Sequence, residues 1–321
     1  MKAGLDIQSS TQLKARLDLL CVGGASYDII LRVPRLPASD EKLVVDFSGI
    51  QAGGLVANTA CAAARLGMRV AWGGLLGKDK GGELSLRAFQ DFEVDTSLVV
   101  VDANQQSDFC VILLDPGGER TILVVPTTPS PPPMNEEILQ AARMSRVVYT
   151  LPHRPEWYLP LADVVHNAGG LMCLDLETSS PSLGPELEAD IQQADIIFCN
   201  KRGLALASRI PDIASGAQRL LDAGVSCVCV TLGKEGAWGF TRLENIQSPG
   251  YAVPVVDTTG AGDCFHAAFL TAYLQGESLK YALEFANGAA ALSVQHIGAR
   301  TGLPTADQVT SFLTTQEQHD G

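Results

Sequence analysis

Residues 257–269 read DTTGAGDCFHAAF, and this stretch decides the fold of the chain. A β-branched run at 253–256 precedes it and an apolar segment at 264–274 follows it. This order predicts a strand, a glycine turn and a helix whose first turn carries Asp263. Unpaired backbone N–H groups at a helix N-terminus, together with the positive end of the helix dipole, bind anions such as a transferring phosphate.

The amides of Gly260, Ala261, Gly262 and Asp263 are the predicted anion hole, because glycine lets the backbone approach a phosphate closely. The carboxylate of Asp263 would repel that anion, so its predicted role is to take a proton from an attacking hydroxyl. The alternative is a capping residue that only stabilises the helix dipole.

A second stretch, residues 53–67, reads GGLVANTACAAARLG. Together with DTTGAGD it resembles the two signatures of the ribokinase/PfkB family of carbohydrate kinases, and the resemblance extends from Leu19 to Pro304. It implies an α/β fold, a three-layer α/β/α (ribokinase-like) body with a small antiparallel β lid. It also implies a phosphotransferase that uses ATP and magnesium.

The composition describes a core-rich globular protein. The chain has 321 residues, of which 46% are hydrophobic and 18% charged, and its net charge is −13. Such an acidic chain is a poor partner for nucleic acid or an anionic membrane, and no apolar run approaches a membrane span. The eight cysteines form no CxxC pair, which favours a cytoplasmic location. We expect residues 1–17 to be a flexible N-terminal extension and residues 18–314 to be a single kinase domain.

Apolar runs alternate with helical patterns, which predicts a parallel sheet covered on both faces. The expected strands are 18–23, 69–76, 146–151, 170–176, 195–199 and 226–232. The expected helices are 57–66, 80–91, 135–144, 155–168, 185–193, 211–223, 263–275 and 278–295. Residues 236–256 read as a short antiparallel excursion.

Four strand-like segments lack crossover helices: 27–36, 42–50, 107–114 and 119–125. We expect them to form the lid, with strands from about 27–50 and 107–125. A one-sided sheet exposes an apolar face, and a partner's sheet is one way to cover it. The expected assembly is therefore a homodimer through the lid.

The resemblance places the sugar site at Asp28, Gly53, Gly54 and Asn58. A carboxylate such as Asp28 can accept two hydroxyl hydrogen bonds, which favours polyols over apolar ligands. The alternatives are a solvated turn residue for Asp28 and a helix N-cap for Asn58. Leu55 stands where many relatives carry a polar residue, which weakens an assignment to ribose.

The resemblance places the nucleotide at Asn200, Thr231, Gly233 and Asn287, although Asn287 also reads as a helix-surface residue. Residues 298–304 (GARTGLP) and 263–266 (DCFH) resemble ketose-kinase branches of the family. The expected reaction is phosphorylation of a hydroxymethyl group on a sugar, with a fructose-like ketose or derivative favoured. The alternatives are a nucleoside kinase of the same fold and a non-catalytic sugar-binding sensor.

Two cation sites follow from the resemblance. Gly203 stands where relatives carry the Glu that organises magnesium, so Asp195, Glu235 or water would have to substitute. Asp257 and Thr259, with carbonyls of 294–299, match a monovalent-cation site that would hold potassium, and a structural Asp closing the turn is the alternative. His153 and Arg154 follow a strand end and read either as contacts for an anionic substrate tail or as a solvated pair.

Overall fold

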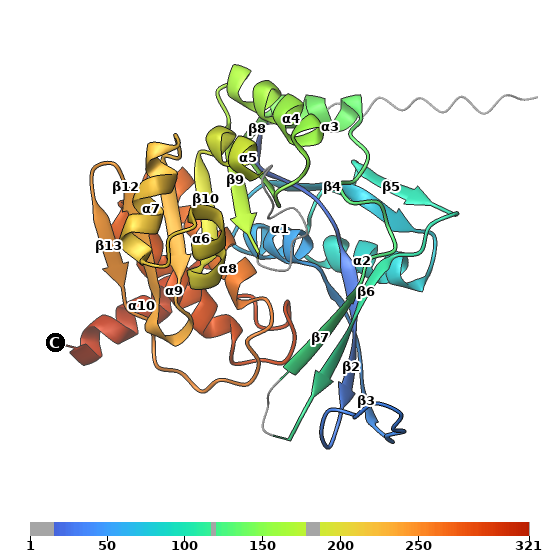
Figure 1. Ribbon diagram of the computed structural model, residues 1–321. Helices are drawn as coiled ribbons and strands as arrows, with labels where there is room; N and C mark the ends of the chain where they lie inside the picture. The colour runs from blue at the N-terminus through green and yellow to red at the C-terminus, as the bar shows by residue number, and fades with distance from the viewer. Residues whose placement is uncertain (1–15, 117–119, 178–186, 321) are drawn as a thin grey trace, which may run out of the picture.

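The computed structural model describes residues 16–116, 120–177 and 187–320. Residues 1–15 of the expected N-terminal extension therefore lie outside the described residues. Figure 1 shows a helical body from which four long strands project. Within the described ranges, no helix has the length and apolar character needed to cross a membrane.

A nine-stranded sheet forms the centre of the body, in the order β13-β12-β11-β10-β9-β8-β1-β4-β5. The strands from β11 to β5 pair in parallel, and β12 and β13 pair antiparallel, as expected for 236–256. The strands are β1 Leu17–Val22, β4 Val70–Gly77, β5 Val99–Asp102, β8 Ser145–Thr150, β9 Leu171–Leu176, β10 Ile196–Asn200, β11 Cys227–Thr231, β12 Ala237–Thr241 and β13 Asn245–Ser248.

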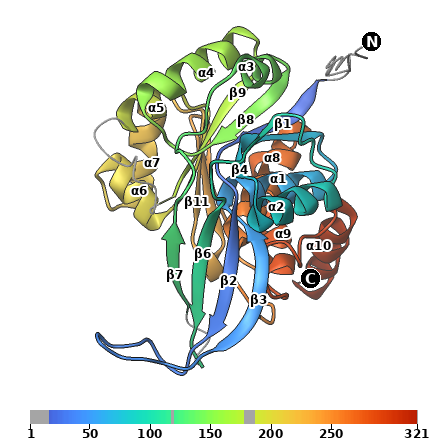
Figure 2. The same ribbon diagram turned by 90° about the vertical axis from the view of Figure 1, so that its right-hand side faces the viewer.

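Helices cover both faces of this sheet, as Figure 2 shows. One layer contains α1 Leu55–Arg65, α2 Lys80–Asp91, α8 Ala261–Leu274, α9 Leu279–Ser293 and α10 Ala306–Asp320. The other contains α3 Glu136–Arg143, α4 Pro155–Asn167, α5 Leu187–Gln193, α6 Lys201–Ser208 and α7 Ile213–Asp222. Two hydrophobic clusters, one on each face of the sheet, confirm the three-layer prediction.

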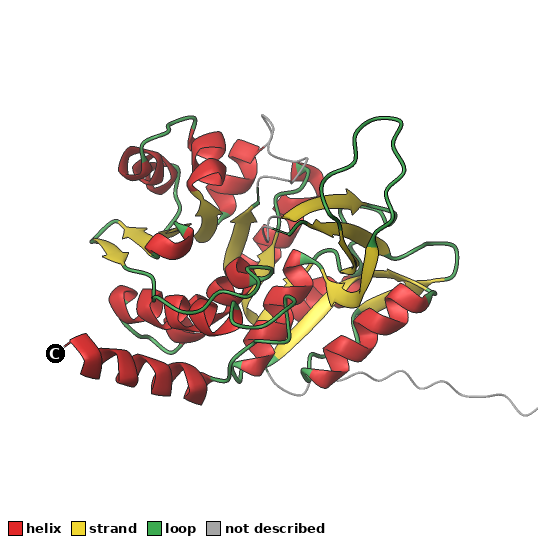
Figure 3. Cartoon of the chain, turned by 90° about the horizontal axis from the view of Figure 1, so that it is seen from below, coloured by secondary structure: helices red, strands yellow, loops and turns green. Residues whose placement is uncertain are grey.

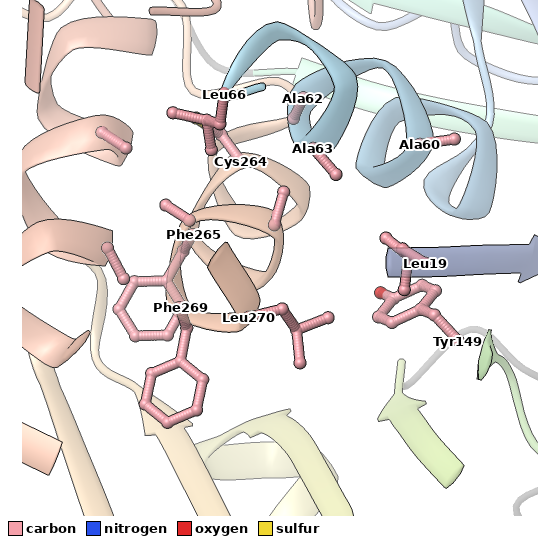
Figure 4. Close-up of a cluster of buried hydrophobic side chains, with 14 of the residues drawn as sticks. Leu19, Ala60, Ala62, Ala63, Leu66, Tyr149, Cys264, Phe265, Phe269 and Leu270 are labelled. Atoms are coloured by element: carbon pink, nitrogen blue, oxygen red, sulfur yellow. The ribbon is translucent and has the colours of Figure 1, made fainter. Parts of the chain in front are cut away.

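Helices α1 and α8 pack closely because their contact surface is made of small side chains. Figure 4 shows Ala62 and Ala63 of α1 beside Cys264 of α8. This contact brings the two sequence signatures together, although about 200 residues separate them in the chain.

The lid is a four-stranded sheet in the order β3-β2-β6-β7, and Figure 3 shows its strands from below. Its strands are β2 Ser26–Arg32, β3 Asp46–Gly53, β6 Asp108–Leu114 and β7 Arg120–Val125. The expectation of a purely antiparallel lid needs correction, because β2 and β6 pair in parallel. Both strands run outward from the body, whereas β3 and β7 return toward it, so the sheet is mixed.

Four further differences concern local structure. Residues 253–256 form no strand, and Val255 and Val256 are 62% and 56% exposed. β-branched residues favour strands only where a neighbouring strand pairs with them, and here Val256 N–H bonds only to Val294 O, at the end of α9. The sequence analysis also did not anticipate β5, α6 or α10, and α10 continues beyond residue 314.

Candidate active site

The N-terminus of α8 is open to solvent, and no side chain among the described residues caps it. Gly260 is its N-cap residue, with φ 75°, and a Cβ there would lie 2.8 Å from Ala299 O. The amide of Ala261 donates to Thr258 O at 3.3 Å. No hydrogen bond between described residues uses the amides of Gly260, Gly262 or Asp263. Three of the four amides of the predicted anion hole are thus free donors at a helix N-terminus within the described part of the chain.

The carboxyl group of Asp263 is buried, with 3% of the residue exposed. Its Oδ2 accepts a hydrogen bond from Asn58 Nδ2 at 2.8 Å. Asp263 therefore does not cap the helix. Nor is Asn58 an N-cap, because Gly54 is the N-cap residue of α1. The α1–α8 contact thus joins the two motifs directly.

The pKa of Asp263 is raised to about 7 by burial. The hydrogen bond from Asn58 and the charge of Arg300 oppose this shift, while the charges of Glu177 and Asp28 add to it. A carboxyl group with a pKa near neutrality is suited to accept a proton under physiological conditions.

Arg300 connects the same residues from the loop after α9, and the sequence analysis missed its role. It is 8% exposed; its Nε donates to Asn58 Oδ1 at 2.9 Å and its Nη2 to Gly53 O at 2.8 Å. Its Nη1 is buried and has no acceptor among the described residues. The sequence shows only that an arginine occurs in the segment 298–304, and nothing in that segment indicates that its side chain would contact Asn58 of α1.

Asp28 lies on β2 and faces Gly53 at the end of β3. A Cβ at position 53 would come within 2.6 Å of Asp28 Oδ2, so glycine allows this close approach. Asp28 is 8% exposed and belongs to a strand, which excludes the solvated-turn alternative. Burial raises its pKa to about 6, against the hydrogen bond from Cys110 and the charge of Arg300.

The candidate nucleotide residues divide into two places. Asn200 and Thr231 pair across β10 and β11 at the carboxyl edge of the sheet, and Gly233 follows in an open turn. Asn287 is instead buried, and its Nδ2 donates to Ser248 O and Oγ and to Pro249 O. It is therefore not a helix-surface residue, and its amide group joins α9 to the end of β13.

The magnesium candidates also separate. A Cβ at Gly203 would lie 2.4 Å from Leu176 O, so this backbone has no room for the missing Glu. Asp195 lies at the opposite end of β10, where its Oδ2 accepts from Met172 N at 2.7 Å, and it cannot substitute. Glu235 lies at the correct edge, 3.8 Å from Lys201 Nζ.

Glu177 is a carboxylate that the sequence analysis did not consider. It follows β9 directly, between the ends of β8 and β10, and its charge acts on both Asp263 and Asp175. The rule that ligands bind at the carboxyl ends of parallel strands could have identified it.

A buried polar network lies beside Asp263. Tyr149 Oη donates to Asp175 Oδ2 at 3.1 Å and lies 3.0 Å from His266 Nδ1, while His266 stacks on Phe198. Burial raises the pKa of Asp175 well above its usual range and lowers that of His266 to about 3. The His266 imidazole is therefore neutral near pH 7.

His153 is buried rather than solvated. Its backbone N–H donates to Asp190 Oδ2 at 2.9 Å, and burial lowers the pKa of its imidazole to about 4. A neutral ring offers no charge to an anionic tail, so the structure supports neither reading of this residue. Arg154 is exposed at the N-cap of α4.

Asp257 and Thr259 come together as expected, but with an additional partner. Asp257 Oδ1 accepts from Thr259 N at 2.9 Å and from Thr259 Oγ1 at 2.7 Å, and its Oδ2 accepts from Gly298 N at 2.8 Å. Arg120 of β7 reaches the same pair, with Nη1 at 3.2 Å from Asp257 Oδ1 and bonded to Thr259 Oγ1. Burial alone would raise the pKa of Asp257, yet these hydrogen bonds and the arginine charge lower it.

Comparison with known proteins agrees with this geometry. The family model described as "pfkB family carbohydrate kinase" matches residues 16–306. An ATP-dependent ribose-1-phosphate kinase from Halopiger xanaduensis is 31% identical over 92% of this chain and 98% of its own. An aminoimidazole riboside kinase from Salmonella typhimurium is 32% identical over 82% of this chain and 88% of its own.

Among solved structures, Arabidopsis thaliana ribokinase complexed with ribose and ATP superposes with a TM-score of 0.84. It is 30% identical, and the match covers 93% of this chain and 99% of that one. The chain therefore belongs to the pfkB family of carbohydrate kinases and is an ATP-dependent sugar or nucleoside kinase of the ribokinase type.

Proposed function

We propose that this kinase transfers the γ-phosphate of ATP to the exocyclic hydroxymethyl group of a pentofuranose, either ribose or a ribose derivative substituted at C1. The observation that carries the reaction is the buried Asp263 carboxyl, bonded to Asn58 beside the free amides at the N-terminus of α8. Support for the substrate class comes from the relatives, which are named for ribose, ribose 1-phosphate and a riboside.

In this mechanism Asp263 accepts the proton of the attacking hydroxyl. Positioned proton transfer of this kind contributes about 10²–10⁴-fold to a rate. Asn58 holds Oδ2 in place, which leaves Oδ1 of the same carboxyl to face the hydroxyl. The amides of Gly260, Ala261, Gly262 and Asp263 stabilise the negative charge of the transferring phosphoryl group, because they are fixed before the reaction begins.

The sugar would be held by Asp28, Asn58 and Arg300. Asp28 accepts hydroxyl protons, and the buried Nη1 of Arg300 is a donor that still lacks an acceptor. A buried donor without a partner is costly, so an oxygen of the bound sugar is a natural occupant of that position. Gly53 and Gly54 shape the wall of this site where β3 ends.

The nucleotide would lie along the ends of β10 and β11, over Asn200, Thr231 and Gly233, with Asn287 fixing α9 behind β13. Magnesium would supply positive charge to the phosphate oxygens. The residues present fit such an ion, because Glu177 brings a carboxylate to the strand end nearest Asp263, and Glu235 offers a second one at the same edge.

Potassium fits less well. Asp257 Oδ1 and Thr259 Oγ1 would have to hold the ion, but both oxygens already accept hydrogen bonds from Arg120 Nη1. No step of the proposed reaction therefore depends on a monovalent ion.

A nucleoside is the second candidate substrate, because the aminoimidazole riboside kinase is among the relatives. The fructose-like ketose favoured by the sequence remains a further one. An assay of ADP release over ribose, ribose 1-phosphate, a purine riboside and fructose separates them. We expect the highest kcat/KM with ribose or a C1-substituted ribose. A preference for fructose would contradict the substrate class, and sugar binding without ADP release would identify a sensor.

We further propose that the enzyme is a homodimer joined through its lids. Apolar side chains on one face of the lid lie open to solvent, with Phe47, Ile50 and Leu123 exposed by 66%, 50% and 51%. Such a face is usually covered by a partner. The eight cysteines are all free thiols, which supports a reducing compartment such as the cytosol.

A further inference from the structure

We propose that Arg120 is the built-in cation of the Asp257–Thr259 site, so that closure of the lid, rather than a potassium ion, supplies the charge that fixes the phosphate-binding turn. The inference rests on the proposed function only for its kinetic readout. Its basis is a set of contacts that join the lid to the loop before α8.

Both carboxylate oxygens of Asp257 already accept hydrogen bonds from donors of the protein itself. Oδ1 receives the backbone N–H and hydroxyl of Thr259 together with Arg120 Nη1, and Oδ2 receives Gly298 N. A monovalent cation needs oxygen atoms that face it without an intervening donor. It could bind here only if the guanidinium withdrew, because the two would otherwise place like charges on one carboxylate.

Arg120 reaches this site from a different part of the fold. It is the first residue of β7, at the edge of the lid sheet, and 137 residues separate it from Asp257. The Arg120 side chain is 30% exposed and that of Asp257 only 19%. The ion pair is thus partly sheltered from solvent, where charge-assisted hydrogen bonds are stronger than at an open surface.

The pair is placed to act on the anion hole. Thr259 directly precedes Gly260, which packs against Ala299. The neighbouring residue, Gly298, donates its backbone N–H to Asp257 Oδ2. Asp257 therefore clamps the turn at 257–260 to the loop that also carries Arg300. An arginine attached to the lid tightens that clamp only when the lid lies against the body.

Arg120 is in this view a positioning residue, because it acts through Asp257 and not on the reacting atoms. The test compares wild type, Arg120→Ala and the control Arg35→Ala. Arg35 also belongs to the lid region, but its ion pair with Glu41 stays within the lid. Each protein is assayed for ADP release, and for its melting temperature, in potassium chloride and in tetramethylammonium chloride at equal ionic strength.

We expect wild type and Arg35→Ala to show the same kcat and melting temperature in both salts. Arg120→Ala should lose roughly 10- to 100-fold in kcat in tetramethylammonium chloride, the range for a lost hydrogen bond to a charged group. Potassium should restore much of that loss and raise the melting temperature of this variant alone, because the vacated oxygens can then bind the ion.

Three results would overturn the proposal. Wild type could be activated or stabilised by potassium over tetramethylammonium, which would show that the ion binds despite Arg120. Arg120→Ala could equal wild type in both salts. Finally, the variant could lose activity with no potassium-specific recovery of rate or stability, which would mark a merely structural role. If no protein releases ADP, the proposed function fails, but the melting temperatures still decide the role of Arg120.

Discussion

Replacing Asp263 by asparagine tests both the chemistry and the electrostatics of the site. The substitution keeps the shape of the side chain and an oxygen that can accept from Asn58, but it removes the group that takes the proton. We expect kcat to fall by roughly 10²–10⁴, while sugar and ATP binding remain. In wild type, kcat/KM should rise with pH through about 7, because Asp263 must be ionised to act as a base.

The same variant should be more stable than wild type at alkaline pH. Burial raises the pKa of Asp263 from 3.8 to about 7, so the folded protein binds this proton more tightly than the unfolded chain does. Below pH 3.8, Asp263 is protonated in both the folded and the unfolded wild type, so it costs no stability. As pH rises from there to about 7, the buried carboxyl lowers the free energy of unfolding of the wild type by a growing amount. At 1.36 kcal/mol per pKa unit, this loss reaches up to roughly 4 kcal/mol.

Denaturant unfolding at about pH 5 and about pH 8 measures the free energy of unfolding of the variant and of the wild type. Linkage predicts that Asp263→Asn gains more stability over the wild type at the higher pH. Asp91→Asn, at the exposed C-terminal end of α2, is the matched control and should show the same small effect at both pH values. An equal gain for Asp263→Asn at both pH values would refute the buried-charge argument. An unchanged kcat would refute the role of Asp263 as the base, even if the stability result were as expected.

Three further expectations follow from the site and the lid. Asp28→Ala should weaken sugar binding by roughly 1–3 kcal/mol per unpaired group, with ATP binding unchanged in calorimetry; equal losses for both ligands would place Asp28 outside the sugar site. Glu177→Gln should raise the magnesium concentration that gives half-maximal rate more than Glu235→Gln does, because the charge of Glu177 acts on Asp263. The reverse order would assign the ion to Glu235. Leu123→Lys should convert a dimer into a monomer by light scattering, since it places a charge on the exposed lid face, and a monomeric wild type would contradict the lid interface.

Local pattern was sufficient for much of the fold and for the turns that precede Asp263 and Asn58. The glycine turn before Asp263 and the paired glycines before Asn58 are steric requirements that short stretches of sequence express directly. Apolar runs alternating with helical periodicity indicated a covered parallel sheet, because each element must bury one face. These features depend on neighbours in sequence, and they were predicted correctly.

Pairings between distant segments were decided only by the tertiary structure. The segment at 253–256 has strand propensity but meets no partner strand, and the parallel pairing of β2 with β6 depends on where each leaves the body. Arg300 bonds to Asn58 across 242 residues of chain, and Arg120 to Asp257 across 137. No periodicity or spacing links such residues, because a long flexible side chain takes its partner from whatever the packed backbone brings within reach.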